Sequence, residues 1–156
     1  MTPAIRLLKK QKIAHSVHEY DHDPNNTNFG LEASEKLGLS PDTVFKTLLV
    51  TDGKAYFVAI LPVCHLLNLK KMANAVGVKK LVMANPSDAE RLTGYIVGGI
   101  SPIGQKKRLK TVIHSSAQNL DKMYVSGGKR GLDIGIAPDE LAGVLITAQF
   151  CDIIDE

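Results

Sequence analysis

The stretch that decides the fold is residues 45–61, FKTLLVTDGKAYFVAIL, in which two runs of strand-forming residues flank Asp52-Gly53. Asp-Gly is a preferred pair for a two-residue turn between antiparallel strands. We therefore predict a hairpin with strands at 45–51 and 54–61. Both runs are nearly continuous in apolar residues, which is typical of strands covered on both faces. The hairpin is expected at the centre of a sheet.

Other helices and strands are predicted on both sides of this hairpin. Cap residues, glycines and apolar spacing indicate helices at 3–12, 30–39, 66–76, from 86 onward and from 138 onward. Strands are expected at 13–20, 81–84, 111–114, 124–126, 132–136 and 148–154, and a glycine-rich loop at 94–104. Helices and strands intermix around an antiparallel hairpin, so the class is α+β or mixed α/β.

Length and composition are those of one globular domain spanning residues 1–156. The apolar fraction of 44% is too high for a disordered chain, and no apolar run is long enough to cross a membrane. The N-terminus lacks the long apolar block of a signal peptide. The two cysteines, Cys64 and Cys151, show no metal-ligand spacing, so we expect free thiols in a reducing cytoplasm.

The net charge of +3 conceals an uneven distribution of charged residues. Residues 53–120 contain ten basic and only two acidic residues, and the basic group at 106–110, KKRLK, is especially dense. Clustered positive charge attracts polyanions such as nucleic acids. A set of solvated helix and loop faces explains the other lysine pairs equally well. The charge pattern is thus compatible with a nucleic-acid partner but does not establish one.

Familiar catalytic motifs are absent or incomplete. Residues 127–131, GGKRG, lack the spacing of a phosphate-binding loop, and residues 99–104, GISPIG, are one residue too long for a nucleophile elbow. His18 and His22 are four residues apart, but the local pattern is strand and turn, so they do not share a helical face. We expect no metal site and no cofactor.

Three places remain as candidates for a functional site. Lys46 is a lone cation in an apolar strand, which is costly unless it is paired or used, although an edge position that reaches water is the alternative. Residues 98–102, GGISP, allow a ligand close to the backbone and could direct N–H groups at an oxyanion, or they could form an ordinary turn. Residues 126–133, SGGKRGLD, combine a flexible loop with two cations and an acid, or they form a long hairpin loop.

These places, in this order, resemble the bacterial YbaK family, which comprises free-standing aminoacyl-tRNA editing proteins that deacylate cysteinyl-tRNA(Pro). The matching segments are TNFG at 27–30, VFKTL at 44–48, GYIVGGISPIGQKKR at 94–108 and VSGGKRGLD at 125–133. The likeness runs through nearly the whole chain. The editing domain of bacterial prolyl-tRNA synthetase is similar in its lysine and in the loop from Gly98 to Pro102.

The resemblance implies a mixed, largely antiparallel sheet curled into a partly open barrel with surrounding helices. It implies a metal-free hydrolase in which Lys46 holds the terminal adenosine or its phosphate and orients the ester. It further implies a substrate pocket that includes Tyr20, Phe29, Thr47, Gly98, Gly99, Ile100, Ser101, Pro102, Ser126, Arg130 and Asp133.

The implied chemistry needs no histidine–nucleophile pair, because the thiol of the bound cysteine attacks its own carbonyl carbon. The implied substrate is cysteinyl-tRNA(Pro), with cysteinyl-tRNA(Cys) as a second one. The alternatives are a deacylase for alanyl-tRNA(Pro) and a non-catalytic RNA-binding module. The implied partners are the acceptor end of tRNA and prolyl-tRNA synthetase, and we expect a monomer.

Overall fold

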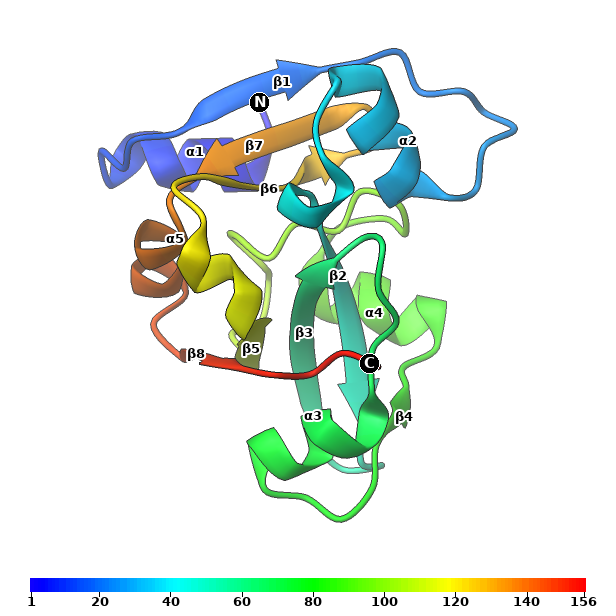
Figure 1. Ribbon diagram of the computed structural model, residues 1–156. Coiled ribbons are helices and arrows are strands. Elements are labelled where there is room, and N and C mark those ends of the chain that lie inside the picture. Colours follow the sequence, from blue (N-terminus) through cyan, green and yellow to red (C-terminus); the bar gives the residue numbers. More distant parts are fainter.

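The computed structural model describes all 156 residues, which form two β-sheets surrounded by helices (Figure 1). The five-stranded sheet has the order β4-β2-β3-β5-β8, and the three-stranded sheet has the order β1-β7-β6. Strands β3, β5 and β8 run parallel, and all other pairs are antiparallel. The strands are β1 Ser16–Glu19, β2 Phe45–Thr51, β3 Tyr56–Pro62, β4 Val82–Met83, β5 Lys110–His114, β6 Met123–Lys129, β7 Leu132–Ile136 and β8 Ala148–Cys151.

The helices begin and end largely where their cap residues predict. They are α1 Pro3–Lys10, α2 Phe29–Leu37, α3 Leu69–Val76, α4 Pro86–Thr93 and α5 Pro138–Leu145, with short 3₁₀ helices at Pro41–Thr43 and Ser115–Asn119. The Asn85 side chain caps α4, and Gly38 and Gly77 end α2 and α3 in the left-handed conformation. The helix expected from residue 66 begins three residues later, because Asn68 supplies its cap. None of these helices is long and apolar enough to pass through a membrane.

The central hairpin is confirmed, but its turn is longer than predicted. Thr51 pairs with Tyr56, so four residues connect the strands instead of the two expected from Asp52-Gly53. The Asp52 carboxylate accepts hydrogen bonds from the backbone N–H groups of Lys54 and Ala55, at 2.9 and 2.8 Å. This side-chain cap stabilises the wider loop.

The hairpin is covered on both faces, as its composition predicts. Along β3, Val58 and Ile60 belong to a core cluster that also contains β6 and β7 residues, so this cluster lies between the two sheets. The alternate residues Ala59 and Leu61 face a second cluster together with Met72 of α3. β3 is the middle strand of the five-stranded sheet, and apolar residues cover both of its faces.

The mixed α+β class is confirmed, whereas the expected barrel is wrong. The two sheets stay separate, and the only backbone bridge between them is the parallel one between Val44, which precedes β2, and Tyr124 of β6. Closure fails because β2 loses its outer partner over several residues. Along that edge, Val44 bridges to the three-stranded sheet. The next backbone partner is Ala84, whose N–H donates to the Leu49 carbonyl, and β4 pairs with β2 from Val50 onward.

The segment 126–133 is a strand hairpin, so the flexible loop is wrong, and of the alternative, a long hairpin loop, only the hairpin is confirmed. β6 and β7 pair up to Lys129 and Leu132, so only two residues form the turn. A β-bulge between Ser126 and Lys129 takes up the extra glycines. The hairpin is thus a firm support for the residues it carries.

Candidate functional site

A cavity of about 340 Å³ opens at the gap in strand pairing along β2. Its size lies at the lower end of the range for small-molecule pockets, about 300–1,000 Å³. Both sheets, the start of α2, the loop before Ile100 and the start of α4 contribute to its walls. The lining residues are Tyr20, Asn28, Phe29, Gly30, Ala33, Val44, Phe45, Lys46, Thr47, Leu48, Leu49, Met83, Ala84, Pro86, Ala89, Val97, Gly98, Ile100, Ser126 and Asp133.

Lys46 is a half-buried cation on the cavity wall, and its side chain makes no ion pair or hydrogen bond with the protein. Burial lowers the pKa of its ammonium, and the neighbouring Cys64 partly opposes this shift. An unpaired cation in a partly desolvated cavity is favoured by an anionic ligand. The position is therefore suited to a phosphate or to a developing oxyanion.

Asp133 supplies a carboxyl group from the opposite sheet. It lies in β7 between Ser126 of β6 and His18 of β1, is 5% exposed, and has no hydrogen-bond donor to its side chain. Burial raises its pKa to about 7. Burial, with the charge of Asp133 added, raises the pKa of Tyr20 to about 12. The cavity therefore contains a cation on one sheet and, on the other, an acid that burial makes harder to ionise.

The loop from Gly98 to Pro102 contributes only part of what its sequence predicts. Gly98 and Ile100 line the cavity, whereas Gly99, Ser101 and Pro102 do not. The Gly99 N–H donates to the Ile96 carbonyl at 2.9 Å, so it is not available for an oxyanion. Ser101 is fully buried, and its hydroxyl accepts from Ile103 N–H at 3.2 Å, which stabilises the turn.

The two glycines of this loop allow it to approach the β6–β7 hairpin closely. A Cβ on Gly99 would lie 2.7 Å from the Cα of Lys129, and one on Gly98 would lie 2.7 Å from the Arg130 side chain. Gly98 also has a φ of +89°, which disfavours any other residue. The double glycine is required because backbone and side chain from the hairpin occupy the adjacent space.

Arg130 lies behind the cavity wall and does not line the cavity itself. Its guanidinium stacks on Phe29 at 4.8 Å from the ring centroid and donates to the Val97 carbonyl from Nε and Nη2, at 3.0 and 2.7 Å. Through these contacts Arg130 links α2, the segment before Gly98 and the β6–β7 hairpin. Arg130 therefore holds Phe29 and Val97 in place.

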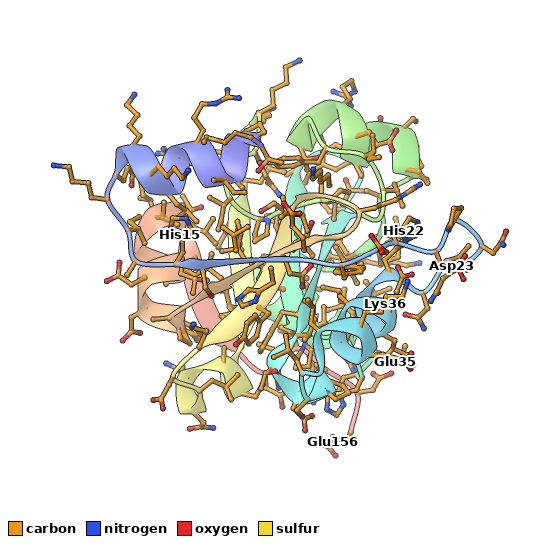
Figure 2. The ribbon with its side chains drawn as sticks, turned by 90° about the horizontal axis from the view of Figure 1, so that it is seen from above. His15, His22, Asp23, Glu35, Lys36 and Glu156 are labelled. Carbon is orange, nitrogen blue, oxygen red and sulfur yellow. The ribbon has the colours of Figure 1, made fainter.

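A buried carboxylate that the sequence did not reveal anchors the segment before α2. Glu32 is 1% exposed and accepts from His22 Nδ1 at 2.6 Å, Asp23 N–H at 2.8 Å and Lys36 Nζ at 3.1 Å. Burial tends to raise the pKa of Glu32, but these three donors lower it below its usual range. Figure 2 shows His22 and Asp23 beside α2, which carries Lys36. The network fixes the chain just before Phe29.

The remaining predicted pocket residues are also brought together, with different degrees of hydrogen bonding. Ser126 lines the cavity, and its hydroxyl accepts from Gly128 N–H at 3.2 Å. Thr47 lines the cavity with a buried hydroxyl that has no hydrogen-bond partner. Such an unsatisfied group is costly unless a ligand or water pairs with it. The wall formed by Met83, Ala84 and Ala89 was missed, because apolar residues carry no signature of a binding site.

Replacing Asp133 by Asn is expected to change the dependence of stability on pH. The folded pKa of about 7 lies above the ordinary 3.8, so the folded state binds the extra proton between these values and loses stability as pH rises through them. At pH 8 the isosteric amide should be more stable, by up to about 4 kcal/mol at 1.36 kcal/mol per pKa unit. At pH 4 the difference should vanish. Urea unfolding at both pH values measures this effect.

The matched control for this experiment is Asp121→Asn, which changes an exposed acid. It should leave the difference between the two pH values as in the unsubstituted protein. A free energy of unfolding that falls equally with pH in the Asp133→Asn variant would show that another group controls this range.

Comparison with known proteins places this geometry in a family. The model of the aminoacyl-tRNA editing domain matches residues 29–144. A protein of Enterococcus faecalis, EbsC, provisionally named a Cys-tRNA(Pro)/Cys-tRNA(Cys) deacylase, is 37% identical over 97% of this chain and 92% of its own length. A proline–tRNA ligase of Geobacter sulfurreducens is 30% identical over 78% of this chain, which is only 21% of the ligase.

Solved structures show the same fold. One, described provisionally as a trans-editing enzyme for prolyl-tRNA synthetase, superposes with a TM-score of 0.84 at 24% identity, over 100% of this chain and 99% of the other. A hypothetical protein gives a TM-score of 0.86 at 24% identity, over 99% and 100% of the two chains. These structures share the fold. The family match from Phe29 to Val144 and the 37% identity to EbsC show that the chain belongs to the aminoacyl-tRNA editing domain family, and it is thus an aminoacyl-tRNA hydrolase.

Proposed function

We propose that this protein is a metal-free trans-editing deacylase that hydrolyses cysteinyl-tRNA(Pro), with cysteinyl-tRNA(Cys) as a second substrate. The observation that carries the proposal is the unpaired Lys46 on the wall of a cavity that also contains Asp133. The 37% identity to EbsC over nearly the whole of both chains supports this substrate class. In this proposal residues 1–156 act as one editing domain.

Lys46 holds the terminal adenosine or its phosphate and orients the ester at the mouth of the cavity. An ammonium without a protein partner is free to pair with a phosphate, and the half-buried position strengthens that interaction relative to water. Fixing the ester in one geometry can lower the barrier of an intramolecular reaction by about 7–11 kcal/mol. The lysine is the catalytic residue of the proposal.

Asp133, Tyr20 and Ser126 hold the amino acid itself. Burial raises the pKa of Asp133 to about 7, and the α-ammonium that every aminoacyl ester carries favours its ionised form when the ester is bound. The free hydroxyl of Thr47 offers a further hydrogen bond to the ester or to the ribose. Phe29, Gly98 and Ile100 complete the wall. Arg130, Gly99, Ser101 and Pro102 act as positioning residues, because they support this wall and do not line the cavity.

The chemical step uses the thiol of the bound cysteine. Its sulfur attacks the carbonyl carbon of its own ester, the bond from that carbon to the ribose oxygen breaks, and the thiol proton passes to the ribose oxygen. The products are free tRNA and a cyclic thiolactone, which water then opens to cysteine. This reaction requires no metal, no cofactor and no nucleophile from the protein.

Deacylation of purified mischarged tRNAs tests this proposal. We expect hydrolysis of cysteinyl-tRNA(Pro) in the presence of EDTA, and slower or no hydrolysis of alanyl-tRNA(Pro). Faster hydrolysis of the alanyl ester favours the alternative specificity, and tight binding without hydrolysis of any ester favours an RNA-binding module. Adding prolyl-tRNA synthetase tests whether it improves discrimination among tRNAs. Sedimentation of the protein alone tests the monomer.

A further inference from the structure

Three potential metal ligands gather outside the cavity, although Asp42 lies 22 residues before Cys64 in the sequence. Cys64 Sγ lies 3.2 Å from Asp42 Oδ1, and His65 Nε2 lies 4.0 Å from the same oxygen. All three donor atoms lie within 4.8 Å of one another. None of these residues lines the cavity, so the editing site does not account for the cluster.

The backbone holds this cluster in place. Asp42 lies in the 3₁₀ helix Pro41–Thr43, and Cys64 and His65 follow the end of β3. The Val63 N–H donates to the Val44 carbonyl at 2.8 Å, which ties the two segments together beside the cluster. The His65 N–H donates to the Pro62 carbonyl at 3.1 Å and closes the turn that carries both ligands. The backbone segments that carry the three side chains are therefore held in place before a metal ion binds.

We propose that Asp42, Cys64 and His65 form a three-ligand binding site for Zn²⁺. A tetrahedral Zn²⁺ with bonds of about 2.0–2.3 Å holds its donor atoms about 3.3–3.8 Å apart. The observed separations from Asp42 Oδ1 are 3.2 and 4.0 Å, and no pair of donor atoms exceeds 4.8 Å, so they lie near this range. A thiolate, an imidazole and a carboxylate together suit Zn²⁺ much better than Mg²⁺ or Ca²⁺, which favour oxygen ligands.

The site is open and lies close to the lysine of the cavity. The side chains of Asp42 and His65 are 74% and 41% exposed, so the ion has a direct entry path. Three protein ligands leave the fourth position for water. Lys46 pairs with Leu61 in the β2–β3 register, three residues before Cys64, so the cluster lies near the lysine of the editing cavity. The proposal does not depend on the editing reaction, and its test needs no tRNA.

Competition of the purified protein with a chromophoric chelator for Zn²⁺ tests the site. We expect one ion per chain, and a loss of affinity of at least about tenfold in each of Cys64→Ser, His65→Ala and Asp42→Asn, because even outer-shell partners are worth about 10–100-fold. Replacement by Co²⁺ should give the ultraviolet charge-transfer absorption of a cobalt–thiolate bond. Cys64→Ser should abolish this absorption.

The matched controls are Cys151→Ser and His15→Ala, which change a thiol and an imidazole outside the cluster. Both should bind Zn²⁺ as the unsubstituted protein does. Thermal unfolding without metal checks that all variants fold, and Zn²⁺ should raise the unfolding temperature only where the three ligands are intact. Unchanged affinity in Asp42→Asn, or equal loss in Cys151→Ser, overturns the three-ligand site.

Discussion

Replacement of Lys46 by Ala should lower kcat/KM for cysteinyl-tRNA(Pro) by about 10²–10³, the range found when one preorganised donor to a developing charge is removed. Lys46 is the cation of the cavity, and no protein carboxylate shares its charge. Its removal therefore weakens binding of the tRNA acceptor end and leaves the ester without a group that orients it. Single-turnover deacylation with saturating enzyme separates this chemical loss from weaker binding.

The matched control is Lys54→Ala, which removes an exposed lysine from the turn of the same hairpin. It should leave the deacylation rate within about twofold of the unsubstituted protein, since an exposed charge outside the cavity contributes only to long-range attraction. Full turnover at saturation in Lys46→Ala, with only weaker tRNA binding, would assign the lysine to a simple phosphate contact and leave the catalytic proposal without its main residue.

The second large effect is expected from the substrate and not from the protein. Seryl-tRNA(Pro) should be hydrolysed at least about 10³-fold more slowly than cysteinyl-tRNA(Pro), although the two esters differ by one atom. A well-oriented intramolecular nucleophile is worth an effective molarity of about 10⁵–10⁸ M, and the serine hydroxyl is far less nucleophilic than a thiol. Single-turnover rates on the two esters of the same tRNA measure the ratio.

Identification of the product distinguishes this mechanism from direct attack by water. Mass spectrometry at short reaction times should detect the thiolactone before it opens to cysteine. The control is cysteinyl-tRNA(Pro) with its thiol methylated. This ester keeps the sulfur but has no free thiol to attack the carbonyl carbon, so it should resist hydrolysis. Equal rates on the seryl and cysteinyl esters would mean that the cavity activates water, and would contradict thiol assistance.

The sequence predicted the elements of the cavity better than their contacts. Alternation, turn residues and caps located the central hairpin, α2 and α4, because these signals are local. Lys46 was singled out because a cation in an apolar strand is unusual, and the structure places it on the cavity wall. By contrast, Glu32 looked like an ordinary helix residue. Its burial depends on donors from His22 and Asp23, about ten residues away.

Tertiary contacts also decide the roles of the loop from Gly98 to Pro102 and of the proposed metal ligands. Gly99, Ser101 and Pro102 have the pattern of a ligand-binding loop, but the turn buries or consumes their polar groups. Asp42 lies 22 residues before Cys64, so no spacing rule could join them. Whether residues meet across such separations depends on strand register and on how the sheets pack.

The sequence by itself determined that the protein has a doubly covered central hairpin, a lone lysine within it and a double-glycine loop. These features follow from side-chain chemistry and backbone preference within a few residues. Only the tertiary structure decided that the sheets remain open, that the gap along β2 becomes the cavity, and that Asp133 faces it from the other sheet. The physical reason is that pairing and burial are satisfied by contacts over the whole chain, and no local pattern records which edges remain unpaired.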